Sequence, residues 1–243
     1  MKKLLLVFLS LTITAGTYLS AQNPGPDEIL AKYFETIGQE NLLKVQTLTV
    51  KGNFMQMGME LPYKIIQKRP AQFYLEIEIQ GAKMKQAYDG VNGWMLSPMS
   101  GSMEPNDITG PELKIIKEQA DIDGYLWKWK EMGFQLELVG TEEMEGSKVY
   151  NLKLTKEGGD IDNFYIDADN YVLLKLKNKI IIQGTEMEQE TLYSNYKPVK
   201  GYLLAHNMDQ RMNGQTMTTI TVSEVLFDEP VSDSLFVKPV AAE

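Results

Sequence analysis

The chain has 243 residues, of which 24 are Lys or Arg, 33 are Asp or Glu, one is His and none is Cys. Disulfide bonds are therefore excluded, and catalysis by a thiolate or by several histidines lacks its usual residues. The formal net charge of −9 at pH 7 argues against a nucleic-acid-binding protein and against electrostatic attachment to anionic lipid.

Residues 1–21 have the pattern of a secretory signal peptide. Lys2 and Lys3 precede an apolar core that is too short and too rich in Ser and Thr to span a membrane comfortably, and small residues follow it. We expect export and cleavage, which leave residues 22–243 as a single domain with 22 basic and 33 acidic residues, a net charge of −11. No cysteine follows to carry a lipid anchor, so the expected location is the periplasm of a Gram-negative cell.

The first element expected after the signal peptide is an amphipathic helix over residues 27–37. Its apolar residues recur at helical spacing and form one face. They are Ile29, Leu30, Tyr33, Phe34 and Ile37. Gly38 follows, where the end of a helix favours glycine.

From residue 45 onward the apolar residues alternate with polar ones, which is typical of half-buried strands. The clearest strand runs over 73–79, where Phe73, Leu75, Ile77 and Ile79 alternate with other residues. Further strands are predicted over 63–67, 83–88, 94–97, 134–139, 150–154, 162–166, 172–177, 185–196, 202–211 and 216–227. Turn sequences separate them, among them Met57-Gly58 and Asn213-Gly214. Ten or more antiparallel strands in one chain predict a large curled sheet or a barrel.

The alternation fails between residues 105 and 132. Pro111 suits the first turn of a helix, and an apolar stripe follows it at Leu113, Ile115, Ile116 and Ala120. The predicted fold is therefore mainly β with helices (α+β): a curled antiparallel sheet with an N-terminal helix and a central helical insert.

An ordered motif runs over residues 68–98. It reads Lys68-Arg69-Pro70-x-x-Phe73, then a strand, then Tyr88-Asp89-Gly90-x-x-x-Trp94-x-x-x-Pro98. The motif resembles that of the periplasmic lipoprotein carriers of the LolA/LolB superfamily, which has lipid-carrying LppX-like relatives. The resemblance implies an unclosed β-barrel whose mouth is covered by helices. It also implies a non-enzymatic carrier that binds the acyl chains of lipoproteins and escorts them toward the outer membrane.

The same resemblance assigns roles to residues and partners. It implies that Arg69 points into the cavity and hydrogen-bonds backbone groups of a helical lid, in which Leu113 and Ile116 are the expected lid residues. From the residues alone, Arg69 is equally well a solvated charge at a strand end. The implied partners are acylated lipoproteins or lipids, an inner-membrane releasing complex and an outer-membrane acceptor. A monomer without a cofactor is expected.

Methionine is unusually frequent, with 14 in the chain. Met55, Met57 and Met59 alternate, which predicts that they share one strand face and, because methionine is flexible and polarizable, that they line an adaptable apolar cavity. Ordinary core packing is the alternative for any one of them. The residues predicted to line the cavity are Met55, Met57, Met59, Phe73, Leu75, Ile77, Met84, Trp94 and Leu96.

Other functions stay open at this point. The chain could carry or sense free lipid or another hydrophobic ligand, serve as a protein-interaction module of the cell envelope, or bind Cu(I) through its methionines. Enzymatic activity is not expected, because His206 is the only histidine and no motif surrounds it. The Asp167-x-Asp169-Asn170 sequence lacks the rest of a calcium loop and predicts a hairpin turn.

Overall fold

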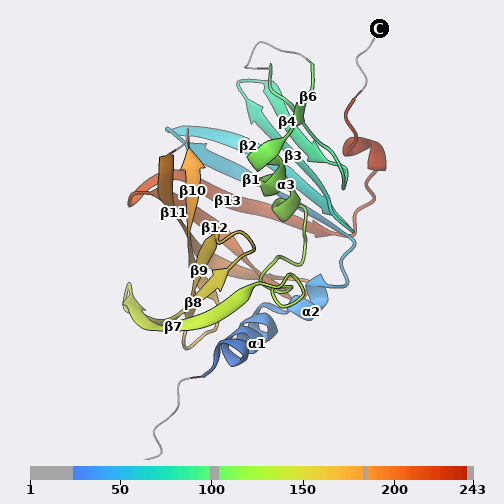
Figure 1. Cartoon of the computed structure of the whole chain (residues 1–243). Helices are drawn as coiled ribbons and strands as arrows, with labels where there is room; N and C mark the ends of the chain where they lie inside the picture. The colour runs from blue at the N-terminus through green and yellow to red at the C-terminus, as the bar shows by residue number, and fades with distance from the viewer. Residues whose placement is uncertain (1–23, 99–103, 183–184, 240–243) are drawn as a thin grey trace, which may run out of the picture.

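A computed structural model describes residues 24–98, 104–182 and 185–239, so the expected signal peptide lies outside the described residues. The described part forms a 13-stranded antiparallel sheet with helices packed on it (Figure 1). The helices are α1 (Pro26–Ile37), α2 (Gln39–Leu42) and α3 (Gly110–Gln119), and a 3-10 turn, η2, spans Asp233–Leu235. The strands are β1 (Thr47–Gln56), β2 (Met59–Lys68), β3 (Gln72–Ile79), β4 (Ala82–Tyr88), β5 (Gly93–Leu96), β6 (Asn106–Ile108), β7 (Gln135–Met144), β8 (Ser147–Thr155), β9 (Ile161–Asp167), β10 (Leu173–Ile182), β11 (Thr185–Val199), β12 (Tyr202–Met212) and β13 (Gln215–Phe227).

The sheet has the strand order β6-β5-β4-β3-β2-β1-β13-β12-β11-β10-β9-β8-β7. Most neighbours are joined by short hairpins, and the pairing of β1 with β13 connects the two halves of the chain. The end strands β6 and β7 do not pair with each other, so the curled sheet remains open (Figure 1). The predicted fold class, an unclosed β-barrel with helices, is confirmed.

Local sequence explains where α1 begins and ends. Pro26 occupies the first turn, where a missing N–H is harmless. Gly38 adopts a left-handed conformation with φ of 70°, and its N–H bonds the carbonyls of Phe34 and Glu35. A Cβ at Gly38 would lie 2.1 Å from the carbonyl oxygen of Gly201, so glycine is required for close contact with the sheet as well as for the turn. The helix predicted over 27–37 is therefore confirmed.

The register assigns alternate residues to two faces of the sheet, which we call the inner and outer faces. The inner face carries the helices. There α1 packs against a cluster that includes Leu152 and Phe164, and α3 packs through Ile116 against Phe73 and Tyr88. Burial of these apolar side chains is the main force that holds the helices on the sheet.

The C-terminal segment 231–236 covers part of the outer face. Phe236 is 0% exposed there and packs with Ile66, Tyr74 and Trp94. The sequence predicted neither this cover nor α2 and β6, because these short elements have no periodicity of their own. The sheet is thus covered on different faces by two different parts of the chain.

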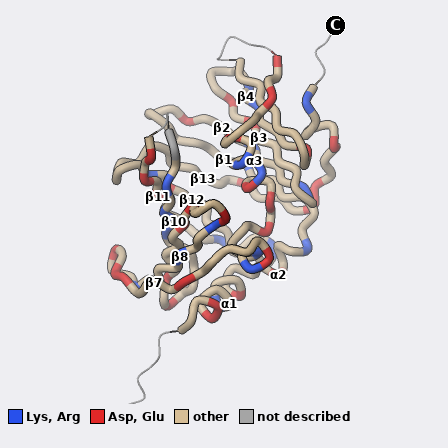
Figure 2. Tube along the Cα trace, in the orientation of Figure 1, with Lys and Arg blue, Asp and Glu red and all other residues tan. Residues whose placement is uncertain are grey.

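Charged side chains of both signs occur throughout the described segments (Figure 2). Many pair across neighbouring strands, as Lys177 does with Glu188 and Lys179 with Glu186. None of the helices in the described segments is both long and apolar enough to cross a membrane.

Candidate functional site

A row of apolar residues crosses the middle of the inner face. Tyr193 of β11 pairs with Met208 of β12, Met208 pairs with Ile220 of β13, Ile220 pairs with Phe54 of β1, and Phe54 pairs with Leu61 of β2. We call these five residues the central apolar row. All except Leu61 are half-buried. At a strand spacing of about 4.8 Å, the row is about 19 Å long, which suits an extended apolar chain.

Four of the predicted cavity residues lie together on β3 and β4 of the same inner face. Ile77 pairs with Met84, and Phe73 and Leu75 follow at alternate positions of the same strand. Phe73 is buried under α3, whereas Leu75, Ile77 and Met84 are half-buried. Phe73 therefore anchors the helix. The other three extend the inner face beyond the central apolar row.

Trp94 and Leu96 lie on the outer face, so the prediction that they share a cavity with Phe73 is wrong. The indole Nε1 of Trp94 donates to the carbonyl of Phe236 over 2.9 Å, and Leu96 packs against the same cluster. Met95, between them, is the residue of β5 that reaches the inner face, where it packs near Leu75. The alternation was correctly recognised, but the sequence does not indicate which face the helices cover.

The prediction that Met55, Met57 and Met59 share one face is also wrong. The β1 strand ends at Gln56, and Met57 lies in the turn with φ of 50° and 84% of its surface exposed. Met59 pairs with Gln56 on the inner face, whereas Met55 points to the outer face. The chain reverses direction at Met57-Gly58, and this turn interrupts the alternation that the sequence pattern predicts.

Arg69 connects three segments at one end of the inner face. Its Nε donates to the carbonyl of Val45 over 2.7 Å, and Nη2 donates to the carbonyl of Leu42 over 3.2 Å. Nη1 donates to Oδ2 of Asp123 over 2.8 Å, and Nη2 also contacts Oδ1 of the same carboxylate. The β2–β3 connection is thereby joined to the end of α2 and to the segment after α3. The role of Arg69 as a latch stays a prediction.

Asp123 is the acceptor at the centre of this network. The Nζ of Lys128 lies 3.2 Å from the carboxylate of Asp123 and 2.7 Å from that of Asp121. The side chain of Gln39 donates to the backbone carbonyl of Asp123. Burial opposes ionisation of Asp123, but the hydrogen bonds from Arg69 and Lys128 outweigh it and lower the pKa of the carboxyl group. The hydrogen bonds that Arg69 donates to Asp123 likewise raise the pKa of Arg69. Asp123 and Arg69 therefore carry opposite charges at neutral pH.

The helix α3 carries the expected lid residues Leu113 and Ile116. Ile116 is fully buried against Phe73 and Tyr88, and Leu113 is partly buried against the same cluster. Gln67 of β2 donates to the carbonyl of Gln119 at the end of α3 over 2.5 Å. One end of α3 is therefore tied to β2 close to the Arg69 network.

A cavity that sequence reasoning did not anticipate lies between α1 and strands β10 to β12. Its volume is about 110 Å³. It is lined by Tyr33, Ile37, Leu173, Tyr193, Tyr196, Tyr202, Leu203, Leu204, Ala205 and Met208. Burial raises the pKa of Tyr193 and of Tyr202 to about 12, and it raises the pKa values of Tyr33 and Tyr196 further. All four tyrosines are therefore neutral hydrogen-bonding groups at physiological pH.

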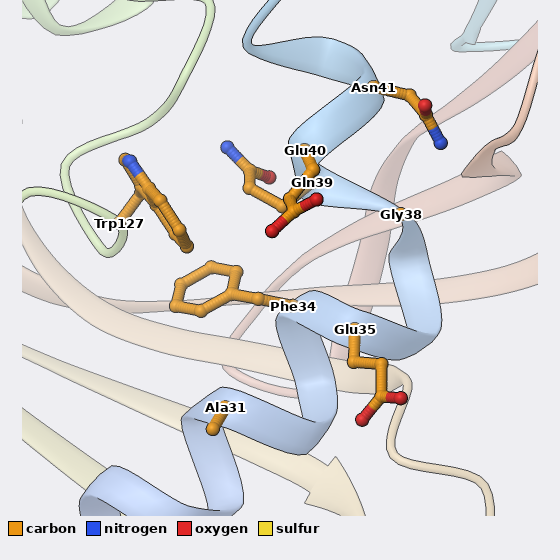
Figure 3. Close-up of a pocket in the computed structure, with 8 residues that line it drawn as sticks. All are labelled: Ala31, Phe34, Glu35, Gly38, Gln39, Glu40, Asn41 and Trp127. Carbon is orange, nitrogen blue, oxygen red and sulfur yellow. The ribbon is translucent and has the colours of Figure 1, made fainter.

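An open cleft of about 630 Å³ lies at the elbow between α1 and α2 (Figure 3). Trp127 lines this cleft and is 37% exposed. Its ring stands edge-on to Phe34 with centroids 4.8 Å apart, and Glu35 and Glu40 lie at the rim. The cleft shares no lining residue with the central apolar row.

No set of three or more His, Cys, Asp or Glu residues in the described ranges is arranged to hold a metal ion. His206 is 8% exposed, and its Nδ1 lies 3.0 Å from the carbonyl oxygen of Leu204. This contact joins the imidazole ring to a backbone carbonyl two residues away, so it does not form part of a catalytic triad.

No protein-family model and no curated protein sequence matches the chain. Solved structures do match. A DUF1329 family protein from Desulfovibrio piger has a TM-score of 0.59 at 15% identity, covering 88% of this chain and 98% of that one. A LolA superfamily protein from Nitrosomonas europaea has a TM-score of 0.59 at 14% identity with the same coverage. A putative outer membrane lipoprotein-sorting protein domain from Vibrio parahaemolyticus has a TM-score of 0.54 at 12% identity, covering 86% and 97%. At these identities the likeness shows the fold, and the resemblance inferred from residues 68–98 is confirmed at that level.

Proposed function

We propose that this chain, which has the fold of the LolA superfamily, is a non-enzymatic periplasmic carrier that shields acyl chains on the inner face of its sheet. The observation that carries the proposal is the central apolar row: apolar residues, four of the five half-buried, cross five strands of an open sheet whose inner face also carries the helices. The cargo we propose is the acylated end of lipoproteins on their way to the outer membrane. An inner-membrane releasing complex and an outer-membrane acceptor would load and unload it.

Removal of the acyl chain from water drives binding. Each buried CH₂ contributes about 0.8 kcal/mol, so a chain lying along even half of the row is held strongly. Met208 adapts to a chain of variable shape, because its thioether side chain is flexible. Release requires the helices to move relative to the sheet. Arg69 is placed to oppose that movement, because its fork of donors bonds two backbone carbonyls and one carboxylate at once.

Two other functions remain distinguishable from this one. A carrier of free lipid would use the same face with a different cargo. An interaction module is favoured by the elbow cleft, where Trp127 and Phe34 form an aromatic wall open to solvent. Copper binding through the methionine run is not proposed, because Met55 and Met59 lie on opposite faces.

In-cell photocrosslinking tests the proposal. A photoreactive phenylalanine analogue replaces Phe54 on the inner face, and the matched control replaces its neighbour Met55, which points to the outer face. Mass spectrometry of the Phe54 adduct should identify acylated lipoproteins that the Met55 variant does not capture. Free glycerolipid in the adduct would instead indicate that the protein carries free lipid. Equal capture of proteins from both positions would contradict an acyl-chain carrier.

A further inference from the structure

Four tyrosines from three different elements meet in the cavity between α1 and the sheet. Tyr33 comes from α1, Tyr193 and Tyr196 come from β11, and Tyr202 comes from β12. Their hydroxyl groups lie close enough to disfavour one another's ionisation.

The hydrogen-bond partners of these hydroxyls are incomplete. The hydroxyl of Tyr196 donates to the carbonyl of Leu173 over 2.5 Å. Those of Tyr33, Tyr193 and Tyr202 have no hydrogen-bond partner among residues 24–98, 104–182 and 185–239. Each phenol has one donor and can also accept, and none of the three hydroxyl oxygens is fully buried, so solvent reaches them and a ligand would replace water there. Three donors are therefore available to a ligand that carries acceptor oxygens.

The absence of charged side chains in the cavity lining restricts which ligands can bind there. None of its lining residues is ionised, and the carboxylate of Asp162, near Tyr193, is already engaged by Tyr125 at 2.6 Å and by Lys156 at 3.0 Å. No cation lines the cavity to neutralise a carboxylate or a phosphate, whose burial without a partner is strongly unfavourable. Neutral carbonyl oxygens are acceptors that the tyrosines can satisfy without this cost.

The cavity is also continuous with the central apolar row. Tyr193 and Met208 belong to both, so an apolar chain lying along the row has one end at the hydroxyls. A volume of about 110 Å³ corresponds to roughly three or four water molecules, which is the size of an ester group with its adjoining carbons. An amphiphile would therefore fit with its polar end under α1 and its tail across β12, β13 and β1.

We infer that the tyrosine cavity binds the neutral acyl-ester group of a lipid whose chain occupies the central apolar row. This inference rests on the proposed function and names the end of the cargo that the protein recognises. The same ester chemistry occurs in free glycerolipids and in the diacylglyceryl group of a lipid-modified protein.

The test compares an ester with its ether analogue. Dioctanoylglycerol and dioctylglycerol have similar chains, but only the first has carbonyl oxygens. Wild-type protein should bind the ester roughly tenfold more tightly in calorimetry, as expected for one or two hydrogen bonds. The triple variant Tyr33→Phe, Tyr193→Phe and Tyr202→Phe should lose this preference while its affinity for the ether is unchanged. The single variant Tyr202→Phe, which makes a smaller change to the cavity, should lose part of it.

The matched control is Tyr165→Phe, which removes a tyrosine hydroxyl from β9 on the outer face and should keep the full preference. Equal affinity of the wild type for ester and ether, or a preference that survives in the triple variant, would overturn the inference and leave the carrier function standing. Failure to bind either lipid would instead remove the proposed function. Binding of a diacylglyceryl-cysteine peptide identifies the source of the ester. Tighter binding than that of dioctanoylglycerol indicates a lipoprotein, and weaker binding indicates a free lipid. Both results support ester recognition.

Discussion

The guanidinium group of Arg69 contacts both carboxylate oxygens of Asp123, although 54 residues separate them in the sequence. The pair joins the connection between β2 and β3 to the segment that follows α3. Because the same guanidinium bonds the carbonyls of Leu42 and Val45, one side chain holds the N-terminal and the central helical segments against the sheet. The geometry makes this contact the most direct place to test whether the helices must move.

Replacement of Arg69 should weaken the fold and speed cargo exchange. In Arg69→Leu, Asp123 keeps only Lys128 as a cationic partner, and two carbonyls lose their donor. We expect a loss of about 2–3 kcal/mol in the free energy of unfolding, measured in urea, and faster release of bound lipid. The control is Arg211→Leu, which removes the only other arginine and changes the net charge equally. Similar release rates in the two variants would contradict a latch.

The pH dependence of stability should reveal the ionisation of Asp123. Its pKa in the folded protein lies below the ordinary 3.8, so the unfolded state binds the proton more readily. The pair therefore contributes its full stability above that value, and the contribution is lost as the pH falls below 3.8 and through the lowered pKa of the folded protein. Urea unfolding of Asp123→Asn should show lower stability at neutral pH and a shallower decline in acid. An unchanged decline would assign the acid sensitivity to other carboxylates.

Gly52 should be required where β1 meets β13. The register shifts between Lys51 and Gly52, and a Cβ at Gly52 would lie 1.7 Å from the carbonyl oxygen of Thr221. Gly52→Ala must displace backbone in the pairing that connects the two halves of the chain, so we expect a loss of about 2 kcal/mol or more. Gly140→Ala, beside the β7 bulge with no atom within 4 Å of its Cβ, should be nearly neutral. Thermal unfolding of both variants measures the difference.

The C-terminal segment should stabilise the outer face through Phe236. Phe236→Ala removes a fully buried ring that packs with Trp94, and we expect a cost of about 3–5 kcal/mol in the free energy of unfolding. Tryptophan emission should shift to the red as the indole of Trp94 meets water. The neighbouring variant Val237→Ala, at a side chain that is 51% exposed, should change stability by less than about 0.5 kcal/mol. An unchanged emission spectrum in Phe236→Ala would indicate that the C-terminal segment does not cover Trp94 in solution.

Particular elements show how far sequence reasoning reached. The helix over 27–37 and the strand over 73–79 were predicted correctly, because helical and alternating patterns of apolar residues are local properties. The motif around Arg69 correctly indicated a fold shared with LolA superfamily proteins. The methionine run misled, because the turn at Met57-Gly58 places Met55 and Met59 on opposite faces although their spacing is that of one strand face.

The sequence by itself determined that this chain forms a large sheet of many strands with two helical segments, because these features follow from the periodicity of neighbouring residues. That the sheet stays open was implied by the family resemblance of residues 68–98. Only the tertiary structure decided which face of each strand the helices cover. As a result, Trp94 lies under the C-terminal segment, and Tyr33 of α1 lies beside Tyr193 and Tyr202. A period of two places side chains on alternate faces but carries no information about what packs on either face, because that depends on contacts between residues far apart in the chain.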